Sequence, residues 1–221
     1  MNSKDYYQIK ESLQEKNVEL VAISKTKPIE AIQEFYNLGQ RVFGENRARE
    51  MQSKYEALPK DIEWHMVGHM QTNKVKYIAP FVHLIHSIDS LSLLEEVNKR
   101  ARQNNRNIQV LLQIHIALEQ HKFGFDLAEI KAILQSPSFH NLKHIEVMGL
   151  MGMATFTDNE QQVRKEFQYM KACFKDIQTS FFPEVDSFNT LSMGMSGDYK
   201  IAIEEGANMV RIGSLLFGHR G

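Results

Sequence analysis

The sequence has a single cysteine, five prolines among 221 residues and no long apolar run. One thiol cannot form an internal disulfide or a cysteine metal cluster, so Cys173 is expected to be a half-buried helix residue. Residues 1–16 are polar and charged, which leaves no apolar core for a secretion signal, and no window reaches membrane-spanning length. These absences predict a cytoplasmic protein that does not bind a membrane.

Neither sign of charge is in excess, because the formal net charge is only -1. Such a balance gives no overall attraction to nucleic acid or to an anionic membrane. The chain is 43% hydrophobic and 24% charged, and it is long enough for one sizeable core. No proline-, glycine- or serine-rich linker interrupts it, so we expect a single domain over residues 1–221. The lack of exposed apolar patterning favours a monomer.

A unit made of a short apolar strand followed by a helical pattern recurs along the chain. Strict alternation predicts a parallel sheet with helical crossovers, and eight units in one domain favour a closed (β/α)₈ TIM-type barrel over an open doubly wound sheet. A polar helix candidate at 4–16 precedes the first strand, and only SLLFG follows the last. We therefore expect a truncated last helix. We also expect an extra N-terminal helix that covers either the gap left by the short last helix or the barrel floor. The strand candidates are 19–24, 40–44, 62–68, 82–88, 108–116, 144–151, 185–192 and 207–213.

The functional groups of such barrels lie at the C-terminal ends of the strands. The stretch ELVAISKTKP places Lys25 directly after the first strand and Pro28 at the start of the next helix. A lysine amine that is desolvated at a barrel mouth can lose its proton and condense with an aldehyde. The alternative is an ordinary solvated lysine.

Two loops that contain glycine and serine follow the last two strands, SMGMSGD at 192–198 and RIGSLLFG at 211–218. Backbone N–H groups at helix starts, assisted by hydroxyls, bind phosphate, and barrels often hold phosphate in these two loops. Turn glycines and capping serines explain either loop alone, but two such loops side by side favour a phosphate site. Arg211 would lie between the phosphate and Lys25; a salt-bridged arginine inside the barrel is the alternative.

A ligand with both a phosphate and a carbonyl would use both features, and pyridoxal 5'-phosphate (PLP) has both. A cation such as Arg211 near its pyridine nitrogen would disfavour protonation of that nitrogen and weaken the ring as an electron sink.

The strings VAISKTKP, FGENR, EWHMVGHMQTNK, IHSIDS, HKFG, MGLM, LSMGMSGD and VRIGSLLFG resemble, in order and spacing, the pyridoxal phosphate homeostasis protein family. The resemblance covers residues 19–218, and EWHMVGHMQTNK and SKTKP are highly specific together. The family is related in fold to the barrel domain of alanine racemase. The resemblance therefore implies a PLP-binding barrel of fold type III.

Residue by residue, Lys25 matches the Schiff-base lysine of that family. Arg211 matches the arginine near the pyridine nitrogen, and Asn46 of FGEN matches a residue on the cofactor side. Met70 stands where the family usually has a branched aliphatic residue, and His115 where asparagine is common. Neither difference affects the lysine or the phosphate loops.

The phosphate-binding loops of the family match Ser192 and Ser196 of LSMGMS together with Gly213 and Ser214 of RIGS. Which of the two serines contacts the phosphate is open at this point. Lys122 of HKFG is a candidate secondary or transfer site, against the alternative of a solvated loop lysine. Lys27 has no assigned role.

The resemblance implies a protein without significant catalysis that holds PLP as a Schiff base for intracellular PLP (vitamin B6) homeostasis and supply, with apo PLP-dependent enzymes as partners. One alternative is a PLP-dependent amino-acid racemase, which needs acid and base groups on both faces of the cofactor. In racemases the opposing base comes from a partner subunit packed with a second domain, and no second domain is expected here. The other alternative is a sugar-phosphate aldolase that uses Lys25 and is colourless as purified.

No metal site and no catalytic residue are expected. His65 and His69 have the spacing of helical metal ligands, but Gly68 and the strand pattern before it break that geometry. His83 and His86 are expected to face opposite sides of a strand. The sequence contains no GxSxG, no Cys/His nucleophile arrangement and no GxGxxG.

Overall fold

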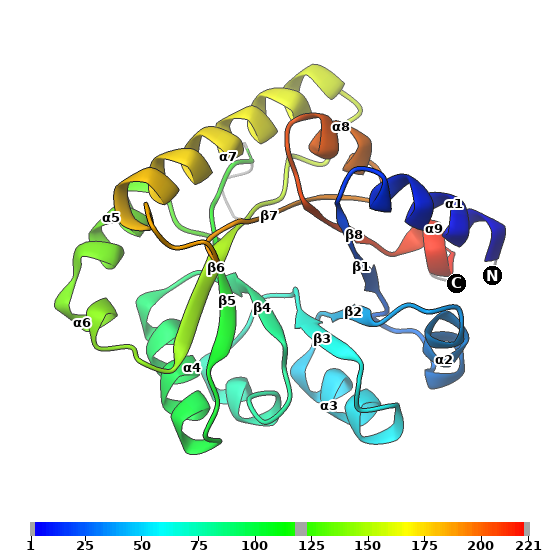
Figure 1. Cartoon of the computed structure of the whole chain (residues 1–221), viewed down its shortest axis with the longest axis horizontal. Helices are drawn as coiled ribbons and strands as arrows, with labels where there is room; N and C mark the ends of the chain where they lie inside the picture. The colour runs from blue at the N-terminus through cyan, green and yellow to red at the C-terminus, as the bar shows by residue number, and fades with distance from the viewer. Residues whose placement is uncertain (1–2, 118–122, 219–221) are drawn as a thin grey trace.

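The computed structural model describes residues 3–117 and 123–218, and side chains from Asp5 onward. Eight parallel strands form a closed barrel in which each strand pairs with the next along the chain and β8 returns to β1 (Figure 1). The predicted (β/α)₈ barrel is therefore confirmed. The strands are β1 (Glu19–Ile23), β2 (Val42–Glu45), β3 (Glu63–Met66), β4 (Leu84–Ile88), β5 (Ile108–Gln113), β6 (Ile145–Met151), β7 (Thr190–Met195) and β8 (Met209–Ile212).

Helices cover the outside of the barrel, because each crossover connection must return the chain to the same end of the parallel sheet (Figure 1). The connection from β3 to β4 is a 3₁₀ helix, η1 (Thr72–Tyr77), where the sequence pattern had predicted an α-helix. The α-helices are α1 (Ser3–Gln14), α2 (Ile29–Asn37), α3 (Ala48–Ala57), α4 (Leu91–Gln103), α5 (Leu127–Gln135), α6 (Pro137–His140), α7 (Glu160–Phe181), α8 (Tyr199–Glu204) and α9 (Ser214–Phe217).

The last helix is truncated to the four residues of α9, and α1 packs beside it. The Tyr6 ring of α1 contacts Phe35 of α2 edge-on at 5.2 Å, and Phe35 contacts Phe217 of α9 at 4.5 Å. The extra N-terminal helix therefore covers the gap that the short last helix leaves, and does not cover the barrel floor.

The seventh strand lies later in the sequence than its predicted range of 185–192. Residues 185–189 form turns, with Phe188 N–H donating to Val185 O at 3.1 Å, and β7 begins at Thr190. The strand runs through Gly194, whose φ of 91° accompanies a shift of register against β8 between Ser192 and Met195. A bulge of this kind re-aims the side chains at the C-terminal end of the strand.

The barrel interior is narrow and mixed in polarity. Register places Arg211 beside Val21, Ser192 beside Met209 and His65 beside Leu84, so these polar side chains lie among the interior apolar ones. The interior apolar cluster consists of Val21, Val42, Leu84, Leu111, Met151 and Met209, and a larger apolar layer lies between the strands and the helices.

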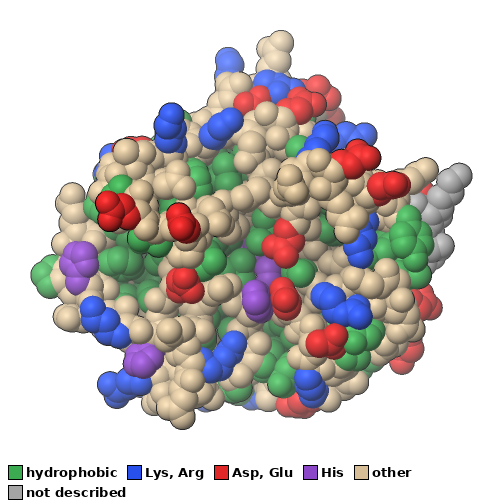
Figure 2. Space-filling view, viewed as in Figure 1, with side chains coloured by type: hydrophobic (Ala, Val, Ile, Leu, Met, Phe, Trp, Pro, Cys, Tyr) green, Lys and Arg blue, Asp and Glu red, His purple; other side chains and the backbone are tan. Residues whose placement is uncertain are grey.

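Over the residues that the structure describes, no helix is both long and apolar enough to cross a membrane. The longest helix, α7, buries Cys173 and Phe167 on one face. Basic and acidic side chains are interspersed over the face shown in Figure 2, which agrees with the small net charge.

Candidate functional site

Lys25 lies in a tight turn that directly follows β1. The Lys27 N–H donates to Ser24 O at 3.0 Å and closes the turn, while Thr26 adopts a left-handed φ of 63°. A non-glycine residue in this region is held there by its surroundings at some cost in energy. The turn directs the Lys25 side chain to the C-terminal mouth of the barrel, where it lines a cavity.

A buried charge cluster from β2 and α3 holds this turn. Lys54 is only 5% exposed and donates to Glu45 Oε1 at 2.7 Å, to Glu50 Oε1 at 2.7 Å and to Ser24 O at 2.8 Å. Ser24 Oγ donates to Glu45 at 2.6 Å, and Thr26 N–H donates to Glu50 at 2.6 Å. The backbone on both sides of Lys25 is therefore fixed by charge-assisted hydrogen bonds.

Burial raises the pKa of Glu45, although the charge and hydrogen bond of Lys54 oppose this shift. For Glu50, partial burial is outweighed by hydrogen bonds from Lys54 and Thr26, so the pKa of Glu50 is lowered. Sequence reasoning missed the role of Lys54, because a lysine four residues after Glu50 on a helix is indistinguishable from an ordinary surface pair.

A cavity of about 570 Å³ opens at the C-terminal ends of the strands, within the range of small-ligand sites. It is formed by segments at or after the ends of β1, β2, β3, β6, β7 and β8. Six of the seven residues predicted from the sequence line it together: Lys25, Asn46, Ser196, Arg211, Gly213 and Ser214.

Ser192 lies beneath this cavity and is fully buried. Its Oγ accepts a hydrogen bond from Arg211 Nη1 at 2.7 Å and contacts His86 Nδ1 at 3.1 Å. Arg211, which is 4% exposed, donates from Nη2 to Gly152 O at 2.9 Å. Burial lowers the pKa of Arg211 to about 10, against the opposing charge of Asp198, so the guanidinium is a cation at neutral pH. Ser192 thus orients Arg211, and Ser196 is the serine at the cavity surface.

The loops that follow β7 and β8 meet at Ser196, whose Oγ accepts a hydrogen bond from Gly213 N–H at 3.2 Å. Met195 N–H donates to Asp198 Oδ1 at 2.6 Å and Asp198 N–H donates to Met195 O at 3.1 Å, which closes a turn around Ser196. A Cβ on Gly197 would meet no atom within 4 Å, so the backbone at this turn is open to an incoming group.

Asn46 is placed by a close approach between the segments that follow β2 and β3. A Cβ on Gly68 would lie 2.5 Å from Asn46 O, so only glycine allows the two segments to pass this closely. The glycine of EWHMVGHM therefore has a structural role in the site.

Sequence reasoning missed the segment between β6 and α7, of which residues 153–158 line the cavity. Thr155 N–H and Oγ1 donate to Glu166 at 2.6 and 2.7 Å, and this buried carboxylate ties the segment to α7. Phe156 stands on the cavity rim and is 98% exposed. No recognisable motif marks these residues in the sequence.

Of the two lysines still without a role, Lys27 lines the cavity and donates to Phe217 O at 3.0 Å and Gly218 O at 3.4 Å, which anchors the C-terminal end of α9. Lys122 lies outside the described residues.

The expectation that His83 and His86 face opposite sides is wrong, because both contact His65. His83 precedes the first residue of β4, so strand alternation does not govern it, and its ring stacks on His65 with centroids 5.5 Å apart. His86 Nε2 lies 3.0 Å from His65 Nδ1. Burial lowers the pKa of His65 to about 3, and the electrostatic effect of His83 adds to this shift. Burial also holds the pKa of His86 well below its usual range, with smaller electrostatic contributions from His65 and Arg211. Both rings are therefore neutral at neutral pH.

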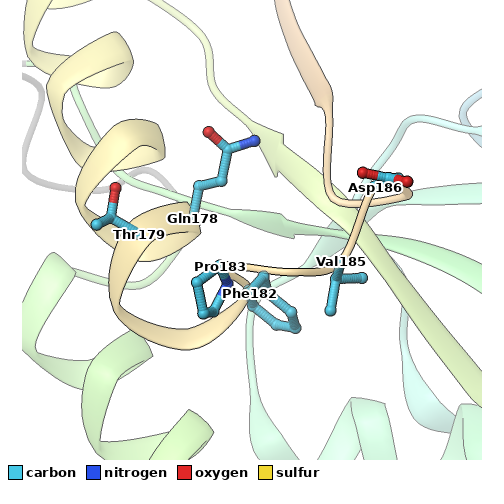
Figure 3. Close-up of a pocket in the computed structure, with 6 residues that line it drawn as sticks. All are labelled: Gln178, Thr179, Phe182, Pro183, Val185 and Asp186. Carbon is cyan, nitrogen blue, oxygen red and sulfur yellow. The ribbon is translucent and has the colours of Figure 1, made fainter.

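A second hollow of about 290 Å³ lies where α7 ends and the chain leads into β7 (Figure 3). It is near the N-terminal ends of the strands, remote from Lys25. Its lining residues are Gln178, Thr179, Phe182, Pro183, Val185 and Asp186, none of which is a predicted site residue.

Replacing Ser192 with alanine is expected to lower the free energy of unfolding by about 2 kcal/mol, because it leaves Arg211 Nη1 and His86 Nδ1 facing a methyl group in a buried place. Urea denaturation measures the change. Ser92→Ala, at an exposed position on α4, is the control and should change stability by less than about 0.5 kcal/mol. Equal losses in the two variants would contradict the role of Ser192.

The residues around the cavity fit a small ligand that carries an anionic group and a carbonyl. Lys25 supplies a primary amine, Ser196 and Ser214 supply hydroxyls, and Arg211 supplies an oriented cation, all on one cavity. The open backbone at Gly197 leaves room for a tetrahedral anion beside these hydroxyls. The chemistry of this donor set is that required to hold PLP.

A family model described as alanine racemase, N-terminal domain, matches residues 3–221. A relative from Aquifex aeolicus, called pyridoxal phosphate homeostasis protein, is 43% identical over 202 residues, which cover 91% of this chain and 86% of that protein.

Among solved structures, PipY of Synechococcus elongatus PCC7942 without PLP is 32% identical with a TM-score of 0.91, covering 99% of this chain and 100% of that chain. The structure of PipY with PLP bound gives 34% identity and a TM-score of 0.81, covering 91% and 93%. An alanine racemase of Clostridium difficile 630 is similar in fold, with 15% identity and a TM-score of 0.74, and the match covers 99% of this chain and 55% of the racemase.

Proposed function

This chain belongs to the alanine racemase N-terminal domain family and, within it, to the pyridoxal phosphate homeostasis proteins, and we propose that it binds PLP in the cavity beside Lys25 and acts in PLP homeostasis. The observation that carries the proposal is the convergence of an amine, a buried cation and two hydroxyl-bearing loops on one cavity. PipY, similar over nearly the whole chain, has been solved with PLP bound.

When bound, PLP supplies an aldehyde that condenses with a primary amine with loss of water. Lys25 would hold the aldehyde end, because the Ser24–Thr26 backbone is fixed by Glu45, Glu50 and Lys54.

The hydroxyls of Ser196 and Ser214, with the backbone at Gly213, would hold the phosphate. In the alternative between Ser192 and Ser196, position at the cavity surface favours Ser196, and Ser192 acts through Arg211.

Arg211 would lie on the ring-nitrogen side, and Asn46 would line the cofactor side. A guanidinium that is already a cation disfavours a second positive charge on a neighbouring pyridine nitrogen. A ring kept neutral in this way is a weaker electron sink, but racemases share this arginine contact, so it does not separate a carrier from a racemase.

The proposal includes the absence of significant catalysis. Racemisation needs acid and base groups on both faces of the cofactor. Asp198 is one of the carboxylates that line the cavity, and it already accepts a hydrogen bond from the Met195 N–H. Burial raises the pKa of Asp198, although this hydrogen bond acts to lower it. The match with the solved alanine racemase covers 55% of that enzyme, so more than the barrel contributes to its length.

The proposal also makes the protein a cytoplasmic monomer that supplies PLP to apo PLP-dependent enzymes. The interspersed surface charges and small net charge support a diffusing carrier over a protein bound to nucleic acid.

The test is to incubate the purified chain with PLP, record the visible spectrum, reduce with borohydride and map the modified peptide by mass spectrometry. One PLP per chain on the peptide that contains Lys25 is expected. Failure to take up PLP, or reduction onto another lysine, would overturn the binding site. Racemisation of alanine at about 10 per second would overturn the non-catalytic role. An aldolase would be colourless and would trap a sugar phosphate instead.

A further inference from the structure

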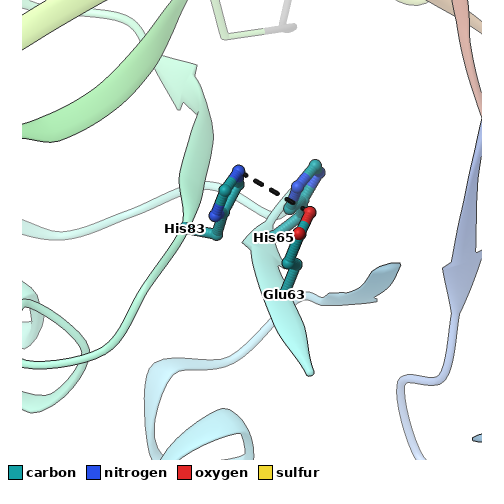
Figure 4. Close-up of side chains that lie close together, drawn as sticks. All are labelled: Glu63, His65 and His83. Atoms are coloured by element: carbon teal, nitrogen blue, oxygen red, sulfur yellow. Dashed lines mark ion pairs between the residues drawn. The ribbon is translucent and has the colours of Figure 1, made fainter. Parts of the chain in front are cut away.

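Three potential metal ligands converge at the N-terminal mouth of the barrel, at the opposite end from Lys25. Glu63 and His65 are two apart on β3 and therefore point to the same side of the strand. The backbone N–H of His83 donates to Trp64 O at 2.9 Å, which holds the His83 backbone beside β3. Figure 4 shows the three side chains together. Their ligand atoms all lie within 4.8 Å of one another, and His83 Nε2 is 3.7 Å from Glu63 Oε2.

This cluster contains an unsatisfied buried atom. His65 is 1% exposed, and its Nε2 has no hydrogen-bond partner among the described residues. Leaving a buried polar atom without a partner costs free energy, so such an atom needs an explanation. A cation that accepts the Nε2 lone pair would satisfy it.

We propose that Glu63, His65 and His83 form a binding site for a divalent transition-metal cation of the zinc class. Two imidazoles and one carboxylate are a ligand set that Zn²⁺ takes in proteins, with the fourth position left to water. None of the three ligands lines the PLP cavity, because that cavity lies at the other end of the strands.

The surroundings of His65 are those of a metal-bound imidazole. Its Nδ1 lies 3.0 Å from His86 Nε2, and such a partner orients a ligating ring and fixes its tautomer. With the metal on His65 Nε2, the proton is on Nδ1 and is donated to His86. His86 Nδ1–H then donates to Ser192 Oγ, which also accepts from Arg211.

Only small movements are needed to close the site. Tetrahedral Zn²⁺ with bonds of about 2.05 Å separates its ligand atoms by about 3.4 Å, so the atoms must approach by up to about 1.4 Å. The His65 and His83 rings are nearly parallel, at 6°, and one of them must turn. The side chains of His83 and Glu63 are 43% and 45% exposed, so neither is enclosed by packing on all sides.

The test uses the chain without added histidines, freed of metal with a chelator and titrated with ZnCl₂ in a calorimeter. One Zn²⁺ per chain is expected, and Co²⁺ in its place should give a visible absorption band typical of tetrahedral coordination. Glu63→Gln and His83→Gln should each weaken Zn²⁺ binding at least about 100-fold, beyond the loss for an outer-shell partner. Both positions are partly exposed, so circular dichroism should show an unchanged fold.

The matched control is His140→Gln, an exposed histidine on α6 outside the cluster, which should bind Zn²⁺ as the unaltered chain does. Absence of Zn²⁺ binding by the unaltered chain would overturn the proposal. So would Glu63→Gln and His83→Gln variants that bind as tightly as the His140→Gln control.

Discussion

Replacing Lys25 with alanine should abolish covalent attachment of PLP. The residual affinity should fall on the order of 100-fold, equivalent to about 2.8 kcal/mol. The reason is that the turn after β1 holds this amine at the cavity, and a methyl group cannot condense with an aldehyde. The measurements are the visible absorption band of the loaded protein, its loss on borohydride reduction, and equilibrium dialysis against PLP.

Lys27→Ala is the matched control, because Lys27 lines the same cavity but uses its amine to anchor Phe217 O and Gly218 O. This variant should retain the visible absorption band and should give the same covalent PLP adduct after borohydride reduction. If the Lys25→Ala variant keeps the same band as the unaltered chain, the assignment of Lys25 is wrong. If the Lys27→Ala variant alone loses the band, the reactive amine is that of Lys27, two residues further along the chain.

The Gly149→Ala variant should lose about 4 kcal/mol of unfolding free energy, as the sum of backbone strain and overpacking. Gly149 follows a bulge in β6 where the register against β5 shifts, and its φ is 150°. A Cβ there would lie 1.9 Å from the backbone oxygen of Thr190 in β7, which cannot move aside as a flexible side chain would. Urea denaturation followed by circular dichroism measures the loss.

Gly197→Ala is the control, since a Cβ at that position meets no atom within 4 Å, and its stability should change by less than about 0.5 kcal/mol. A Gly149→Ala variant that is as stable as Gly197→Ala would show that β6 and β7 can separate at this point. Since Gly152 O orients Arg211, such a movement should also weaken PLP binding.

Much of the fold was predictable because its signals are local. Alternation of apolar strands with helical patterns repeats within short windows, and its eightfold recurrence was sufficient for the barrel. The exact bounds and register of the strands were harder to predict. The range predicted for β7 begins too early, because the turn at 185–189 has the composition of a strand, while Gly194, which belongs to the strand, has the character of a turn residue.

The same distinction separates the two serines of LSMGMS. The sequence could not choose between Ser192 and Ser196, because the bulge in β7 decides which side chain enters the interior and which reaches the cavity. Likewise, the proximity of His83 to His65 depends on where β4 begins, and the burial of Lys54 depends on how α3 packs against β2.

By itself, the sequence determined the barrel, the lysine at the end of β1 and the two glycine- and serine-containing loops, because periodicity and chain order are enough to place strand ends at one mouth. Only the tertiary structure decided which groups lie beneath that mouth. It set Ser192 under Arg211, Lys54 behind Lys25, and His65 between His83 and His86. Those contacts join residues distant in the chain, and their partners are chosen by register, bulges and side-chain direction, which no local pattern records.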